Sequence, residues 1–101
     1  DSFFINAARG SLVEDIDIFY NRLFEGSLGG IALDVLPEEP PDYSSKILSA
    51  WKDNHEWAKS KIIINPHTSY YSLEAFEEMR SKAAYMALSI INNTDVKNRI
   101  I

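Results

Sequence analysis

The chain has 101 residues, 46% hydrophobic and 25% charged, which is typical of one soluble globular domain or a piece of one. Its net charge of -5 argues against nucleic acid as a partner, because phosphate binding requires a basic surface. No apolar run approaches the roughly 20 residues of a membrane span, so no membrane partner is expected. The absence of cysteine excludes disulfides, thiolate catalysis and cysteine metal ligands.

The ends of the sequence lead to two further expectations. No signal peptide is recognisable, so we expect a cytoplasmic protein. The sequence opens at Asp1 and runs directly into a predicted strand, so we expect it to be a fragment of a longer protein.

The first predicted strand lies in residues 2–8, around the apolar run Phe3-Phe4-Ile5. Arg9 and Gly10 follow as a turn. Ser11, with Glu14 three residues later, forms a capping box and predicts that a helix begins there. Gly26 is the predicted C-cap of this helix. Its apolar face, at helical spacing, consists of Leu12, Ile16, Phe19, Tyr20 and Leu23.

The second predicted strand covers residues 31–35 and is apolar except for Asp34 near its carboxyl end. The proline-rich residues 37–41 must form a loop, because proline continues neither strand nor helix. In residues 42–59, which resemble an insertion, Ile47, Leu48 and Trp51 predict a short helix.

The third predicted strand is Ile62-Ile63-Ile64, which we expect to be buried on both faces as in parallel sheets. Pro66 ends this strand, and His67 follows it. Histidine is the residue type whose side chain has the unperturbed pKa closest to neutral pH. Ser69 or Ser72 then caps a long helix that ends near Asn92. The predicted apolar face of this helix is Phe76, Met79, Ala83, Met86 and Ile90.

Alternation of strands and helices predicts an α/β fold, a three-layer Rossmann-like fragment with about three parallel strands in chain order and a long C-terminal helix. Parallel strands bring their carboxyl ends to one edge, where ligands bind. Arg9, Asp34, Glu39 and His67 should therefore gather there. Each also has a structural interpretation: Arg9 covers an apolar surface, Asp34 caps a turn, Glu39 is a loop carboxylate and His67 is a hydrogen-bonded structural residue.

Four motifs carry a resemblance: Asn-Ala-Ala-Arg-Gly-Ser-Leu-Val at residues 6–13, Ala-Leu-Asp-Val at 32–35, Glu-Glu-Pro at 38–40 and Asn-Pro-His at 65–67. In this order they resemble the C-terminal half of the nucleotide-binding domain of D-isomer-specific 2-hydroxyacid dehydrogenases. The segment Pro-His-Thr-Ser-Tyr-Tyr at 66–71 is most similar to the D-lactate dehydrogenase branch. The resemblance implies that residues 1–101 are the C-terminal part of a Rossmann-type NAD-binding domain.

The resemblance implies a role for each site residue. Arg9 would bind the carboxylate and carbonyl oxygen of a 2-oxo acid, a bidentate task that suits guanidinium. His67 would exchange a proton with that carbonyl, and Glu39, which directly precedes proline as in the family, would hydrogen-bond the imidazole and favour its protonated form. Asp34 resembles the residue that contacts the nicotinamide carboxamide of NAD. The cofactor-binding residues implied in this way are Ala7, Ala8, Arg9, Asp34 and His67.

The sequence also departs from the family. The glycine-rich turn that seats the pyrophosphate and the separate substrate domain are absent, so the chain alone is expected to be inactive. His55, in polar sequence, is expected to be an exposed residue. Two alternatives to a dehydrogenase stay open: a corepressor-like protein of the same family that uses NAD to control assembly, and a structural fragment without activity. A short sheet leaves apolar surface uncovered, so we expect a homodimer.

Overall fold

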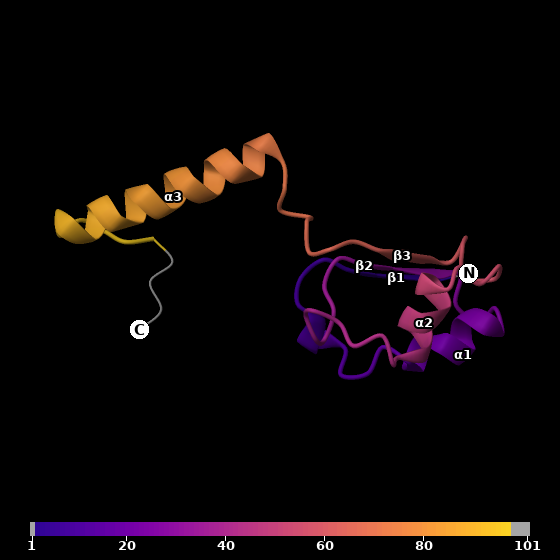
Figure 1. Cartoon of the computed structure of the whole chain (residues 1–101). Coiled ribbons are helices and arrows are strands. Elements are labelled where there is room, and N and C mark those ends of the chain that lie inside the picture. The colour runs from indigo at the N-terminus through magenta and orange to yellow at the C-terminus, as the bar shows by residue number, and fades with distance from the viewer. Residues whose placement is uncertain (1, 98–101) are drawn as a thin grey trace. The chain divides into compact units, whose positions relative to one another are not determined.

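The structure, a computed structural model, describes residues 2–97 and forms two compact units, Asp1–Ser69 and Tyr70–Ile101. The last predicted tail residues, 98–101, lie outside the described part. The first unit contains strands β1 (Phe3–Asn6), β2 (Gly30–Leu33) and β3 (Ile62–Ile64), the 3-10 helix η1 (Gly10–Leu12) and helices α1 (Ile18–Phe24) and α2 (Lys46–Lys52). The second contains helix α3 (Leu73–Ile91) (Figure 1).

The three strands form one parallel sheet in the order β1-β2-β3, as the alternating pattern predicts. At the carboxyl edge, Asn6 pairs with Leu33 and Leu33 pairs with Ile64. The ladder continues one step further, because the amide of Asn65 donates to the carbonyl of Leu33 at 2.9 Å. The segments that leave the three strands therefore start side by side.

Helices α1 and α2 cover one face of this sheet (Figure 1). On the sheet side Phe4 packs on Phe19, with ring centroids 4.8 Å apart. Leu23 and Ile47, from the two helices, are completely buried. The buried core that results consists of Val13, Ile16, Phe19, Leu23, Ile31, Leu33, Leu36, Ile47, Leu48, Ala50, Ala58 and Ile62.

The opposite face of the sheet is exposed within residues 2–69. Phe3, Ile5 and Ile63 are 71%, 73% and 61% exposed. The prediction that β3 is buried on both faces is therefore wrong for this unit, because Ile62 points into the core while Ile63 points away from it. The sheet and the layer of α1 and α2 are the two layers described in this unit.

The first helix begins later than predicted. The chain forms η1 after Arg9, no side-chain hydrogen bond caps it, and α1 starts only at Ile18. One reason is Asp15, whose carboxylate accepts the amide of Asp17 at 2.8 Å and so favours a local turn over a helix. Consequently Leu12, predicted on the apolar helical face, is 69% exposed. The predicted helix end is confirmed, because Gly26 follows α1 with a φ of +79°.

Asp17 connects the start of α1 to the start of α2. Its carboxylate accepts the Ser45 hydroxyl at 2.6 Å and the amides of Lys46 and Ile47 at 2.9 Å each. Burial raises the pKa of Asp17, but the Ser45 hydrogen bond and these two amides outweigh that effect and lower it. The predicted helix in residues 42–59 thus exists, and its N-terminus is anchored by a residue far away in the sequence.

In the second unit, Ser72 caps α3, because its hydroxyl accepts the amide of Ala75 at 3.1 Å. The long predicted helix is confirmed. Its predicted apolar face is only partly covered within this unit: Met79 and Ile90 are 46% and 63% exposed. No helix among residues 2–97 has both the length and the apolar character needed to cross a membrane.

Candidate active site

Arg9, Glu39 and His67 line one hollow of about 250 Å³ at the carboxyl edge of the sheet. They arrive from the segments that follow β1, β2 and β3, so the parallel topology alone brings them together. The remaining lining residues are Gly10, Ser11, Val35, Leu36 and Pro37. Asp34, the fourth polar residue predicted at this edge, does not line the hollow and is buried beside it.

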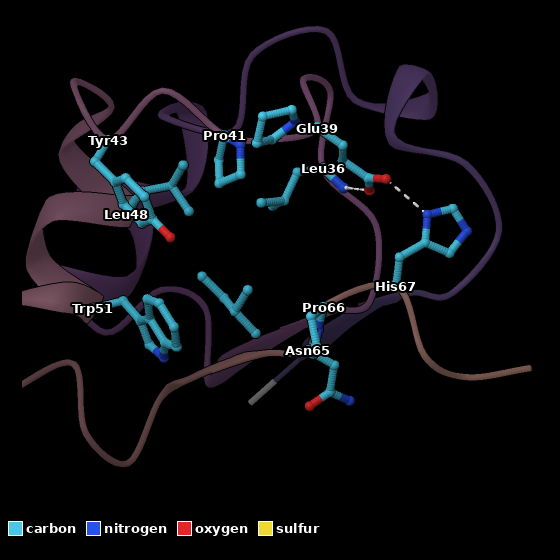
Figure 2. Close-up of a pocket in the computed structure, with 11 residues that line it drawn as sticks. Leu36, Glu39, Pro41, Tyr43, Leu48, Trp51, Asn65, Pro66 and His67 are labelled. Atoms are coloured by element: carbon cyan, nitrogen blue, oxygen red, sulfur yellow. Dashed lines mark hydrogen bonds and ion pairs between the residues drawn. The ribbon is translucent and has the colours of Figure 1, made fainter. Parts of the chain in front are cut away.

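Glu39 and His67 form a direct pair. Nδ1 of His67 lies 2.7 Å from Oε2 of Glu39, and Oε1 of Glu39 accepts the amide of Leu36 at 2.9 Å (Figure 2). The hydrogen bond with His67, with the Leu36 amide second, holds the pKa of Glu39 below its ordinary value. Glu39 is therefore a carboxylate at neutral pH. Nδ1 is thus the ring nitrogen of His67 that Glu39 holds. Glu38 lines a different hollow, which excludes His67.

Asp34 holds the backbone at the histidine and at the two residues that follow it. Its carbonyl accepts the amide of His67 at 2.8 Å, and its carboxylate accepts the amides of Thr68 at 2.9 Å and Ser69 at 3.0 Å. His67 has a φ of +54°, a left-handed conformation that is uncommon for a side chain of this size. Burial raises the pKa of Asp34, but hydrogen bonds from Ser69 and Thr68 outweigh it and lower the pKa.

The loop that carries Arg9 is held in two places. The side chain of Asn6 is buried and bonds Arg9 through its amide nitrogen and Ala8 through its oxygen. Gly10 packs against the backbone of Leu36 so closely that a Cβ atom there would lie 1.8 Å from the Leu36 oxygen. The Arg9 guanidinium is exposed, and Nη1 donates to the carbonyl of Ala8 at 2.7 Å.

From the sequence, Asn6 is predicted only as part of a motif and Gly10 only as part of a turn. The sequence signal for Asn6 is its register: it shares a strand face with Phe4, so a polar residue stands where the alternation predicts a core residue. For Gly10 there was no local signal, because its neighbour Leu36 is distant in the sequence.

A second hollow, of about 400 Å³, is also lined by Glu39 and His67, but Arg9 does not line it. Figure 2 shows Trp51 and Tyr43 at one end of it, and Glu39 and His67 at the other. Its walls are mainly apolar, including Leu36, Pro41 and Leu48. The larger hollow is therefore not the one in which the three polar residues meet.

The other sequence-predicted residues have simpler surroundings. Ala7 and Ala8 are exposed directly after β1, and a methyl side chain leaves the strand end accessible to a planar ligand. His55 is exposed as predicted and lines neither hollow that contains His67. Within residues 2–97, no group of three or more histidine, aspartate and glutamate side chains could hold a metal ion.

The parallel sheet and the polar residues at its carboxyl edge define a Rossmann-like α/β protein with a candidate ligand site at the strand ends. Comparison with known sequences then gives the family. The sequence model described as "D-isomer specific 2-hydroxyacid dehydrogenase, NAD binding domain" matches residues 1–69. The chain belongs to the D-isomer-specific 2-hydroxyacid dehydrogenase family, as its motifs predict.

Individual relatives agree with this placement. A D-specific alpha-keto acid dehydrogenase of Enterococcus faecium is 36% identical over 85 residues, which cover 80% of this chain and 26% of the relative. The chain thus spans about a quarter of that relative. Two solved structures share the fold at 23% identity and each covers 98% of this chain. A D-isomer specific 2-hydroxyacid dehydrogenase from Xanthobacter autotrophicus, in complex with NADPH, has a TM-score of 0.67, with 36% of its own chain covered. A D-lactate dehydrogenase from Treponema pallidum has a TM-score of 0.66, with 31% covered.

Proposed function

We propose that residues 1–101 are the C-terminal part of the NAD-binding domain of a dehydrogenase that interconverts a 2-oxo acid and a D-2-hydroxy acid. The observation that carries this proposal is the meeting of Arg9 with a Glu39–His67 pair in one hollow. An arginine, a proton-exchanging imidazole and a carboxylate that orients it are the groups that reduction of a 2-oxo acid requires. Membership of the family supports the same assignment.

Arg9 would bind the substrate carboxylate through its planar fork of N–H donors. In the structure its Nη1 is bonded to the carbonyl of Ala8 next to it in the chain. The substrate carboxylate would therefore replace the neutral carbonyl of Ala8 as the acceptor of this N–H group, or accept from it as well. A charged acceptor makes the stronger hydrogen bond with a guanidinium. The guanidinium would orient C2 of the substrate towards His67.

His67 would supply the proton. As a hydride forms a new C–H bond at C2, the π electrons of the carbonyl would move to its oxygen, and that oxygen would take a proton from the imidazolium of His67. Oxidation of the hydroxy acid runs the same transfer in reverse. Glu39, held as a carboxylate by His67 and the Leu36 amide, fixes the orientation of the ring through Nδ1. The backbone of His67 has a left-handed conformation and is held by Asp34, which fixes the direction in which the imidazole side chain leaves the backbone.

NAD is the cofactor we propose, and when bound its nicotinamide supplies the hydride that adds to C2. The exposed Ala7 and Ala8 offer a strand end without bulky side chains, which fits a planar ring. Asp34, whose carboxylate accepts the amides of Thr68 and Ser69, would contact the carboxamide. The glycine-rich pyrophosphate turn is not in this sequence, so we propose that the chain alone is inactive.

We further propose a homodimer. The exposed sheet face of Phe3, Ile5 and Ile63 supports an assembly that covers apolar surface. Exposed apolar residues of α3, such as Leu88 and Ile91, support the same conclusion. Analytical ultracentrifugation of the full-length protein tests it, since a monomer at high concentration would contradict the proposal.

The activity is tested on the full-length protein that contains this chain. It is mixed with NADH or NADPH and a panel of 2-oxo acids: pyruvate, 4-methyl-2-oxopentanoate and phenylpyruvate. We expect turnover with NADH and a D-2-hydroxy acid as the product. Binding of NADH without turnover of any member of the panel would contradict the dehydrogenase and favour the NAD-regulated binding protein. An L-hydroxy acid as product would contradict the assignment of stereochemistry.

A further inference from the structure

Two polar side chains are buried among residues 2–69, and both lie at the carboxyl edge of the sheet: Asn6, the last residue of β1, is 5% exposed, and Asp34, directly after β2, is 6% exposed. A buried carboxamide is tolerated only when its donor and its acceptor are both bonded. Asn6 meets this condition entirely within the next three residues. Its Nδ2 donates to the carbonyl of Arg9 at 2.9 Å, and its Oδ1 accepts the amide of Ala8 at 3.1 Å.

These two bonds close the loop that presents Arg9. The carbonyl of Arg9 also accepts the amide of Leu12 at 3.2 Å. Arg9 is therefore both the last residue of this loop and the N-cap residue of η1. The backbone of Asn6 belongs to the sheet, because its carbonyl accepts the amide of Asp34 at 2.9 Å. The Asn6 side chain therefore ties the backbone of Arg9 to the β1–β2 ladder.

We propose that Asn6 is a positioning residue for Arg9 and sets the direction from which the guanidinium meets a substrate carboxylate. The proposal rests on the proposed function, in which Arg9 binds the carboxylate of a 2-oxo acid. The Arg9 side chain is long and exposed, so its reach is determined mainly by where its backbone is held. A merely structural Asn6 would stabilise the fold and leave the action of Arg9 unaltered.

The test uses Asn6→Asp in the full-length protein, with pyruvate as the substrate. Aspartate keeps the size and the oxygen that accepts the Ala8 amide, but it places a second oxygen against the Arg9 carbonyl where a donor stood. We expect the KM for pyruvate to rise about 10- to 100-fold, as for a small displacement of a substrate-binding group. The affinity for NADH should not change, because aspartate keeps the bond to the Ala8 amide, and kcat at saturating pyruvate should change less than KM, because Glu39 and His67 are untouched.

A double-mutant cycle with Arg9→Ala separates positioning from general damage. If Asn6 acts through Arg9, Asn6→Asp should have almost no further effect on kcat/KM once Arg9 is removed, whereas independent effects would multiply. Asn6→Ser provides a second route should the aspartate variant fail to fold, because its hydroxyl can accept the Ala8 amide but is too short for the Arg9 carbonyl. Asn21→Asp, on the exposed surface of α1, is the control and should match the unmodified protein.

Equal losses of kcat/KM from Asn6→Asp with and without Arg9 would overturn the proposal on Asn6 and leave the proposed function standing. If the unmodified protein neither reduces nor binds any 2-oxo acid of the panel, the proposed function fails and the proposal on Asn6 falls with it. A KM that rises only where Arg9 is present supports both.

Discussion

Replacing Gly10 with alanine is the sharpest steric perturbation of the candidate site. A Cβ at this position would lie 1.8 Å from the oxygen and 2.2 Å from the carbon of the Leu36 carbonyl, whereas ordinary contact begins at 3.4 Å. Both neighbours are backbone atoms, so no side-chain rotation relieves the clash. The Gly10 loop and the Leu36 segment would have to separate by about 1.5 Å.

That separation acts on catalysis because each side of the contact carries part of the site. Gly10 follows Arg9 directly, and the amide of Leu36 is held by Oε1 of Glu39 at 2.9 Å. Moving the two backbones apart therefore moves Arg9 away from the Glu39–His67 pair. A displacement of about 1 Å can cost about 100-fold in rate, so kcat/KM for pyruvate should fall by about that factor or more.

The assay is the loss of NADH absorbance with purified full-length protein, corrected for the folded fraction by circular dichroism. Gly26→Ala is the matched control. Gly26 has a φ of +79° and its Cβ would meet nothing within 4 Å, so alanine there should cost about 1 kcal/mol of stability without altering kcat/KM per folded molecule. Unaltered kcat/KM in Gly10→Ala would refute the argument that this contact sets the geometry of the site.

Two further predictions concern the polar residues themselves. Arg9→Lys should raise the KM for pyruvate about 10-fold or more despite the retained charge, because an ammonium cannot reproduce the planar fork, and steady-state kinetics will measure it. Glu39→Gln should lower kcat for reduction of pyruvate by about 10- to 100-fold, because the imidazole of His67 loses the carboxylate that orients it through Nδ1. Steady-state kinetics checks this, with Glu38→Gln as the control; a loss in Glu38→Gln and none in Glu39→Gln would show that the pair is wrongly assigned.

The pH dependence of stability gives Glu39 a second readout in the same variant. Its pKa is lowered from 4.5 in the folded protein, so its hydrogen bonds stabilise the fold above that pH. This contribution is lost as the pH falls through the lowered pKa. The thermal unfolding temperature of Glu39→Gln should therefore be lower than that of the unmodified protein at neutral pH. In acid the two unfolding temperatures should converge.

The sequence was sufficient for the sheet and for the polar residues at its edge. Three short apolar runs separated by helical segments define a parallel order, and that order brings Arg9, Glu39 and His67 together whatever the details of the loops. The choice of Glu39 over Glu38 also agrees with the structure, in which only Glu39 of these two reaches the His67 ring.

The start of α1 and the exposure of β3 could not be predicted, because each depends on contacts between distant segments. Ser11 and Glu14 have the spacing of a capping box, but Gly10 is held against Leu36 and the chain turns into η1 instead. Ile63 is apolar enough to be buried, but both short helices pack on the other face of the sheet. A local pattern reports propensity, whereas these outcomes are decided by tertiary packing.

The most direct test of the central claim is the effect of His67→Ala in the full-length protein on turnover of a 2-oxo acid with saturating NADH. If His67 is the group that exchanges the proton, kcat should fall by about two to four orders of magnitude, while the dissociation constant for NADH should barely change, because the imidazole would face the substrate and not the dinucleotide. His55→Ala, at the exposed histidine outside the site, should have no effect. Unchanged turnover in His67→Ala would contradict the account, because the hollow would then lack the proton donor on which the proposed reaction depends.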